Sequence, residues 1–193
     1  SLFGSNLDHT MTNYLLRDAP TASLWRRNSA SGDNMGFKLM TTVFDNTGSS
    51  TFGFDGFSAK HNSDIDNPNN PMFFVENFNN AKRKVLGVFF ERTEDFTTHW
   101  SGEFGLRFNR VEMDADKVNA TPAMMMPAAA TLRDTFNNSK LRQVDNNLDL
   151  AAKAWFRATD NASWYLGVAQ KNRSPSYQER YLWLPLQTTA GLA

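Results

Sequence analysis

The stretch that decides the fold runs from Ser163 to Leu186 and reads S-W-Y-L-G-V-A-Q-K-N-R-S-P-S-Y-Q-E-R-Y-L-W-L-P-L. In its first part, large apolar residues at Trp164, Leu166 and Val168 alternate with small or polar residues. This alternation with a period of two residues is typical of a β-strand that has one apolar face and one polar face. The segment therefore predicts a strand that lies between two unlike environments.

Working outward from this strand, the same alternation recurs along the rest of the chain. The further segments that show it are residues 1–17, 35–43, 51–60, 84–92, 100–109 and 147–157. Strands are about five to ten residues long and point successive side chains to opposite faces, so each segment is long enough to form one strand. The sequence therefore predicts an all-β fold with about seven antiparallel strands.

The predicted strands are joined by connections that alternate between short and long. Short turns are expected near residues 45–49, 93–95 and 159–161, and the long connections cover 21–33, 61–81 and 113–142. The segment 61–81, dense in Asn, Asp and Pro, is predicted to be a surface loop, and the Ala-rich part of 113–142 is predicted to form a short helix. Outer-membrane barrels keep this alternation of tight turns and long loops, whereas soluble sandwiches seldom do.

Composition excludes several classes of protein. The 193 residues carry no net charge and contain no cysteine. The chain therefore lacks the positive surplus of a nucleic-acid-binding protein, and it can form no disulfide scaffold, thiolate zinc site or cysteine nucleophile. The mean hydropathy is −0.52 and no run of about 18 apolar residues occurs, which argues against a membrane helix. A membrane β-barrel remains open, because its strands place apolar residues only at every second position.

The polar face of the predicted strands carries charges of both signs at the strand centres, among them Glu103, Arg107, Asp149, Lys153 and Arg157. A water-filled barrel lumen accepts such a face, which favours a transmembrane β-barrel portion. The alternative is a soluble β-sandwich binding module that exposes these charges to water. Carboxylates such as Glu103 and Asp149 are explained as charged residues of the lumen and need no catalytic role. Because no catalytic motif occurs either, an enzyme is not expected.

The residues that follow the last strand, 173–181, read R-S-P-S-Y-Q-E-R-Y. Pro175 removes a backbone donor, and Tyr177, Tyr181 and Trp183 are amphipathic aromatic residues of the kind that gather at a membrane–water interface. We interpret this run as a structural anchor in an aromatic girdle. The pattern R-x-P-S-x-x-E-x-Y resembles strand ends in TonB-dependent outer-membrane receptors and looks most like the copper-receptor branch of that family.

The resemblance implies a location and a set of partners. Receptors of this family close a barrel of about 22 strands around a plug, so residues 1–193 are expected to be part of the barrel domain of a longer chain. The plug and the energy-coupling box have no counterpart in this sequence. The resemblance implies a Gram-negative outer membrane, contact with its lipid, and coupling to the TonB complex through the plug.

His9, Thr10 and Met11 form an H-x-M pair. In an extended strand, residues i and i+2 share a face, so the imidazole and the thioether can converge on one ion. These donors suit copper, above all cuprous copper, because thioethers are soft ligands. The surrounding D-H-x-M-x-N-Y-x-L-R, residues 8–17, is similar to the barrel segment that faces the plug in copper receptors. The resemblance implies that the plug supplies the remaining ligands.

A second group of thioethers, Met124, Met125 and Met126, lies in a predicted extracellular loop. Exposed thioethers there are able to capture copper at the cell surface, and the alternative is that they pack the loop against a neighbour. His61 and His99 have no ligand partner at a suitable spacing, so they are read as loop and lumen residues.

The predicted function is uptake of a scarce ligand across the outer membrane, with copper as the transported ion. A ferric siderophore or another metal chelate is the alternative ligand within the same family. For such a ligand, Tyr177, Arg180 and Trp183 are able to supply the aromatic and guanidinium contacts.

Overall fold

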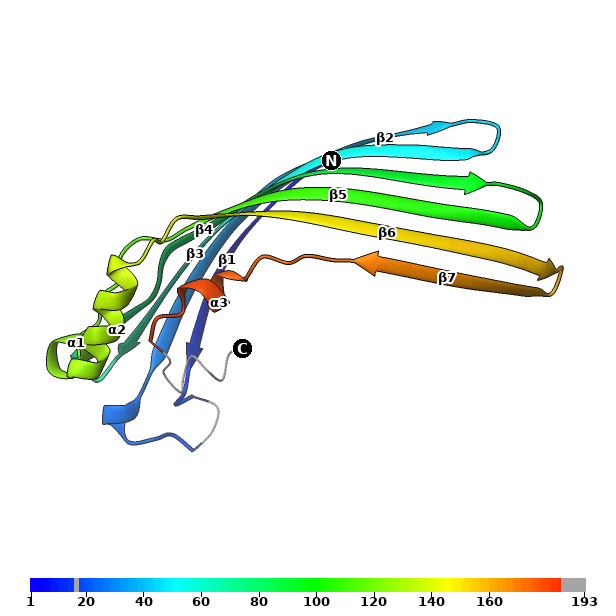
Figure 1. The fold of residues 1–193 in the computed structure, drawn as a ribbon. Helices are drawn as coiled ribbons and strands as arrows, with labels where there is room; N and C mark the ends of the chain where they lie inside the picture. The colour runs from blue at the N-terminus through cyan, green and yellow to red at the C-terminus, as the bar shows by residue number, and fades with distance from the viewer. Residues whose placement is uncertain (16–17, 185–193) are drawn as a thin grey trace.

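A computed structural model describes residues 1–15 and 18–184 of the chain. Within these ranges seven strands form one sheet in the order β1 to β7, and every neighbouring pair is antiparallel (Figure 1). The strands are β1 (Leu2–Thr12), β2 (Arg27–Phe44), β3 (Gly48–Asn67), β4 (Asn70–Asp95), β5 (Trp100–Asp114), β6 (Gln143–Thr159) and β7 (Ala162–Gln170). The prediction of an all-β antiparallel barrel portion is confirmed, and the two-sheet sandwich alternative is wrong.

In residues 1–15 and 18–184, helical structure is confined to short segments between and after the strands. These are a 3-10 helix (Ala22–Leu24), α1 (Pro122–Met125), α2 (Pro127–Asn138) and α3 (Tyr177–Tyr181). The helix predicted in the Ala-rich segment is confirmed as α2. Among the described residues, no helix has the length and apolar character needed to cross a membrane.

The two ends of the sheet differ in their connections (Figure 1). At one end, which we call the turn rim, short turns of residues 45–47, 96–99 and 160–161 join the strands. At the other end, the loop rim, lie the β1–β2 connection, the tip of the β3–β4 hairpin, the segment with α1 and α2, and the segment with α3. The tight turns at one rim agree with the prediction for an outer-membrane barrel.

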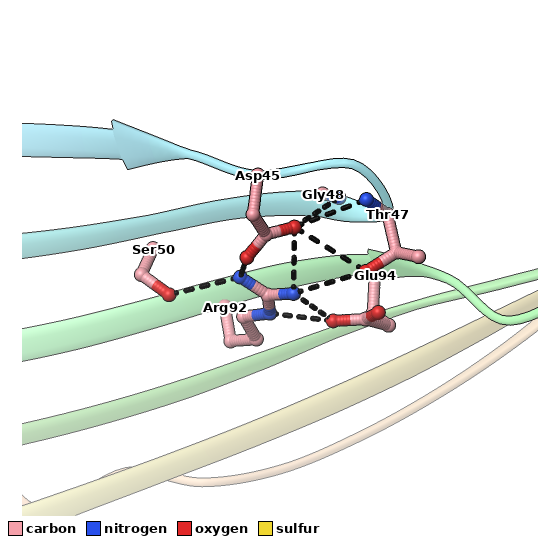
Figure 2. A network of polar contacts seen from close by, with 6 residues as sticks. All are labelled: Asp45, Thr47, Gly48, Ser50, Arg92 and Glu94. Atoms are coloured by element: carbon pink, nitrogen blue, oxygen red, sulfur yellow. Dashed lines mark hydrogen bonds and ion pairs between the residues drawn. The ribbon is translucent and has the colours of Figure 1, made fainter.

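The turn rim is stabilised by a network around Arg92 (Figure 2). Its guanidinium donates to Asp45 Oδ2 at 2.5 Å and to Ser50 Oγ at 3.1 Å, and it pairs with Glu94. Asp45 Oδ1 also accepts from the backbone N–H groups of Thr47 and Gly48. A Cβ at Gly48 would lie 1.9 Å from Thr93 O, so the close approach of β3 and β4 here requires glycine.

One face of the sheet carries a belt of exposed apolar side chains. Cross-strand pairs set Phe54 opposite Val88 and Phe108 opposite Leu148, so the large residues of neighbouring strands lie side by side. This outer belt consists of Leu39, Phe52, Phe54, Leu86, Val88, Phe104, Leu106, Phe108, Leu148, Trp164, Leu166 and Val168. An apolar patch of this extent is too large for a surface that faces water and fits contact with lipid acyl chains.

The opposite face, which we call the inner face, is covered near the loop rim. Two clusters of buried residues pack there, one around Ile65, Val75 and Trp183 and the other around Met113 and Tyr181. Both clusters contain residues of the β3–β4 hairpin and of residues 173–184, which we call the α3 segment. These two parts lie about a hundred residues apart in the sequence. The loop-rim half of the inner face is therefore packed like the core of a soluble domain.

The predicted surface loop 61–81 is wrong. β3 continues to Asn67, only Pro68 and Asn69 form the turn, and β4 begins at Asn70, so the connection is a tight hairpin and the long–short rhythm fails here. The pairing of β3 with β4 shifts its register between His61 and Ser63, and Asn80 of β4 has a φ of 52°. The start of β4 was missed because bulges interrupt its alternation, and the end of β3 was missed because its polar residues bond within the protein.

The predicted aromatic girdle is also wrong for Tyr181 and Trp183. Both side chains are buried on the inner side of the sheet, with Trp183 5% exposed, rather than facing a membrane interface. The chain turns into α3, where Ser176 and Glu179 form a reciprocal capping box. The Ser-x-x-Glu pattern is a helix-start signal, and it was read as part of a strand end.

Two strand boundaries near the N-terminus differ from the prediction. β1 ends at Thr12 rather than Arg17, because Tyr14 leaves the ladder and stacks on Trp25 at 4.6 Å. β2 begins at Arg27, eight residues before the predicted start at Met35, since small and polar residues there pair with β1 and β3. The predictions that extend to residues 16–17 and 185–186 lie outside the described residues.

Candidate functional site

His9 and Met11 lie on one face of β1. His9 is paired with Ala30 and Met11 with Asn28, in a register without a bulge. Met11 lines a pocket together with residues of α3, so both side chains belong to the inner face, and both are near the end of β1 at the loop rim. Whether they bind a metal ion stays a prediction.

The pocket has a volume of about 530 Å³ and lies between the inner face of β1–β4 and the α3 segment. This volume is within the range of small-ligand sites. Its side chains come from three parts of the chain that are far apart in sequence. Its lining includes a thioether, polar and aromatic side chains and one glycine, contributed by Met11, Asn28, Gly32, His61, Ser63, Asn77, Tyr177 and Glu179.

Three buried polar residues form a short network at this pocket. Ser63 Oγ donates to Asn28 Oδ1 at 2.8 Å, and Asn77 Nδ2 donates to Ser63 Oγ at 3.4 Å. Asn77 is 4% exposed, and its Oδ1 has no hydrogen-bond partner. A buried amide oxygen without a donor is rare in folded proteins, and Asn77 supplies one beside this pocket.

His61 is held in a defined orientation in the same pocket. Its ring stacks on the ring of Tyr177 with a centroid distance of 4.2 Å and an interplanar angle of 14°. A Cβ at Gly32 would lie 3.2 Å from His61 Nδ1, so the imidazole extends over Gly32. His61 lies beyond the outer belt, towards the loop rim, and burial lowers its pKa. Burial therefore favours the neutral form of the ring, which is the form that ligates metals.

The α3 segment is fixed over the inner face by polar contacts at both ends. At its start, Asn147 Nδ2 of β6 donates to Ser174 Oγ at 2.7 Å, and further on Arg180 pairs with Asp145 of β6 at 2.9 Å. Within the segment, Arg173 pairs with Glu179 at 2.6 Å. Trp183 Nε1 donates to Glu76 O at 2.8 Å. The ion pair with Arg173, together with the Ser176 contacts, lowers the pKa of Glu179 to about 2. The segment that covers the pocket is therefore held in place by defined contacts with the sheet.

Tyr181 is the buried centre of the same segment. Its hydroxyl donates to Leu141 O at 2.9 Å, and burial raises its pKa to about 12. The phenol is neutral at all physiological pH values. Within α3, Tyr181 therefore has a structural role, whereas Tyr177 faces the pocket.

The methionine run lies elsewhere. Met124 and Met125 are in α1, next to the tip of the β3–β4 hairpin, and Met126 follows the helix. The three side chains are exposed, Met125 by 85%, while Ala123 is the buried residue of α1. The structure therefore does not bring these thioethers together with His9 and Met11, and within the described chain they do not pack against a neighbour.

His99 lies in the β4–β5 turn at the turn rim, where its Nδ1 is 3.0 Å from Thr98 Oγ1. It is remote from the pocket, whose lining residues lie towards the other rim. Among residues 1–15 and 18–184, no three His, Cys, Asp or Glu side chains are grouped so as to hold a metal ion. A metal site on this part of the chain therefore needs methionine or ligands from outside it.

Sequence reasoning missed His61 and Asn77 as pocket residues, whereas Tyr177 was named as a contact for the alternative, chelated ligand. His61 was placed in a loop because the Asn- and Pro-rich composition of 61–81 hid the strand. The available signal was the continued alternation of Ala59, His61, Ser63 and Ile65 on one face. Their place in one pocket with Met11 depends on strand register and on the return of α3, which no local pattern reveals.

Comparison with known proteins identifies the fold. A search of curated proteins found no match. Among solved structures, the chain is similar to one named Copper transporter OprC, with a TM-score of 0.71, 16% sequence identity and coverage of 92% of this chain. The chain spans 27% of the length of that protein. The family model described as TonB dependent receptor-like, beta-barrel matches residues 2–192, and the chain therefore belongs to the TonB-dependent receptor β-barrel family.

Proposed function

We propose that residues 1–193 are part of the barrel domain of an outer-membrane receptor that takes up copper. The observation that carries the proposal is the placement of His9 and Met11 on the inner face near the loop rim, with Met11 lining a pocket. An imidazole and a thioether on one face form a soft donor pair that suits cuprous copper. The name of the similar solved structure, a copper transporter, supports the same ion.

The transport cycle requires parts beyond this chain. The outer belt contacts membrane lipid, a plug completes the metal site, and the plug couples the receptor to the TonB complex of a Gram-negative cell. Transport of this kind moves the ion without making or breaking covalent bonds, so the receptor is not an enzyme. Met124, Met125 and Met126 are exposed at the loop rim, where they are suited to capture copper before it reaches His9 and Met11.

A siderophore is a weaker candidate on the contacts observed. Arg180, which was considered for chelate binding, pairs with Asp145. Trp183 is buried and donates its indole N–H to Glu76 O. Both groups therefore serve the packing of the α3 segment, while Tyr177 remains at the pocket.

The experiment is a titration of the purified full-length receptor with Cu(I), using an indicator chelator as competitor. Met11→Leu keeps the volume and apolarity of the side chain and removes the sulfur, so the protein is expected to fold and to bind Cu(I) at least about tenfold more weakly. Met35→Leu, on the exposed outer face of β2, is the matched control and should bind as the parent does. His9→Ala should act as Met11→Leu does.

Growth of a deletion strain supplies the second readout. Loss of the receptor should slow growth on limiting copper and leave growth on limiting iron unchanged. Equal Cu(I) binding by the parent and by Met11→Leu, or a growth defect confined to limiting iron, would refute the proposal.

A further inference from the structure

We propose that the face of the sheet that carries the outer belt also holds a binding site for a phosphorylated membrane lipid. The site lies where the outer belt meets the loop rim, and it combines an apolar groove with a cluster of cationic side chains. This basic cluster consists of Lys60, Lys82, Lys84, Arg110 and Arg142. The inference goes beyond the proposed function, because the site is on the lipid side of the sheet and takes no part in binding copper.

The position of the basic cluster follows from the strand register. On the outer face of β5, large apolar residues and one glycine run from Trp100 to Phe108, and the next outer position is Arg110. Eight residues of an antiparallel strand rise roughly 27 Å, so even a tilted strand spans most of the apolar band of about 25 Å in outer-membrane barrels. Arg110 therefore lies where the apolar band ends and the lipid headgroups begin.

Three lysines lie next to this border on β3 and β4. Lys84 and Lys82 are the next two outer positions after Leu86 in the direction of the loop rim, and Lys60 is paired directly with Lys82. All three side chains are exposed. Like charges directly opposite each other on neighbouring strands destabilise a sheet, so the pairing of Lys60 with Lys82 points to an anion that compensates for the repulsion.

The carboxylates of the same surface do not neutralise the lysines. Glu112 pairs with Arg110 at 3.1 Å and with Arg142 at 3.6 Å. The other two, Asp33 and Asp114, each accept a hydrogen bond from an amide group. Among residues 1–15 and 18–184, none of the three lysines forms an ion pair. The surface therefore keeps a surplus of positive charge that is available to a ligand.

An apolar groove of about 510 Å³ lies on the belt side of the lysines. On the outer face its floor is one row of paired residues, Phe37 of β2, Gly56 of β3 and Leu86 of β4, and the row continues to Arg110. A Cβ at Gly56 would lie 2.4 Å from Phe37 Cε1, so the aromatic ring lies across the glycine. Lys84 lines the same groove. The groove is thus apolar towards the outer belt and basic towards the loop rim.

Both parts of the site are satisfied by one ligand, a lipid with phosphate groups. Lysine ammonium groups bind phosphate oxygens as point charges, and acyl chains fit the apolar groove. Each Lys or Arg near a membrane surface strengthens the binding of anionic lipid about fivefold. A free phosphate ion would use the cations but leave the apolar groove uncovered, so the groove favours a lipid as the occupant.

The test is native mass spectrometry of the delipidated full-length receptor in a neutral detergent, titrated with lipid A that carries two phosphate groups. We expect Lys82→Gln combined with Lys84→Gln to bind this lipid about 25-fold more weakly than the parent, because two charges are lost. Lys82→Arg combined with Lys84→Arg keeps the charges and should bind as the parent does. Lys38→Gln combined with Lys153→Gln removes two exposed lysines of the inner face, and this matched control should also bind as the parent does.

Two further probes separate the possible occupants. Dioleoyl phosphatidylcholine has acyl chains without net charge, and inorganic phosphate has charge without acyl chains. The proposal is overturned if phosphatidylcholine is retained as strongly as lipid A, if equimolar inorganic phosphate displaces lipid A, or if the double Gln variant binds lipid A as the parent does. The double Gln variant should bind Cu(I) as the parent does, so failure of the lipid site leaves the proposed function standing, and the reverse also holds.

Discussion

The two halves of the sheet share one alternating pattern but place their large apolar residues on opposite faces. In the half near the turn rim, the large apolar residues point outward and stay exposed, as Leu106 and Leu166 do. In the half near the loop rim, residues such as Ile65 and Met113 point inward and are buried under the segments that carry α1, α2 and α3. One half is therefore built for contact with lipid and the other is built like a soluble core.

The difference shows where the stability of each half comes from. The outward residues of the belt stabilise the fold only when a membrane or detergent covers them, because their apolar surface is otherwise exposed to water. The inward residues at the loop rim stabilise the fold by packing closely against one another within the chain. The pocket lies in the second half, so its geometry depends on internal packing.

The largest expected effect concerns the packed half. Trp183→Ala removes a buried indole and its hydrogen bond to Glu76 O, and substitutions of this kind cost about 3–5 kcal/mol. We expect α3 and the tip of the β3–β4 hairpin to exchange amide hydrogens faster in the full-length receptor, while strands of the belt keep their protection. Trp164→Ala, on the exposed face of β7, is the control. Unchanged exchange at α3 in Trp183→Ala would contradict the packing described.

A slightly smaller effect is expected in the belt. Leu106→Arg places a charge among outward apolar residues, and such charges cost roughly 2–4 kcal/mol near the middle of a bilayer. Ala151→Arg, on the inner face next to Gly105, is the matched control and should cost much less, because the lumen accepts charge. Unfolding by urea in liposomes measures both. Equal losses for the two variants would mean that the two faces do not differ in environment.

These contrasts also mark what the sequence was able to predict. In the belt, alternation is uninterrupted, so strands such as 100–109 were located correctly. The tight turns near residues 45–49 and 159–161 were also located correctly, whereas the one predicted at 93–95 lies at 96–99 because β4 continues to Asp95. At the loop rim, the same rule failed at 61–81, where bulges shift the register and Asn side chains bond within the fold. His9 and Met11 were found because they are neighbours in sequence. His61 was not, because its place in the pocket depends on pairing through β2 and on the return of α3.

The smallest expected effect is a dependence of α3 on pH. The folded-state pKa of Glu179 is lowered to about 2, chiefly by Arg173, while the unfolded carboxyl keeps its ordinary value. The ionised group therefore stabilises α3 fully above about pH 4.5, and this contribution is lost as the pH falls towards 2. Amide exchange at α3 should speed up over this range. Glu179→Gln should exchange faster at neutral pH and lose most of the acid dependence; an unchanged acid dependence would contradict the assignment.

The central claim, that the even-numbered residues of β5 face lipid and the odd-numbered ones face the lumen, is tested most directly by site-directed spin labelling. Single cysteines are placed at each position from 103 to 108 of the full-length receptor in liposomes, with any native cysteines replaced, and the collision rates with oxygen and with a water-soluble nickel chelate are measured. The account predicts maxima of oxygen accessibility at 104, 106 and 108 and maxima of nickel accessibility at 103, 105 and 107. Accessibility without a period of two residues, or with the opposite phase, would contradict it.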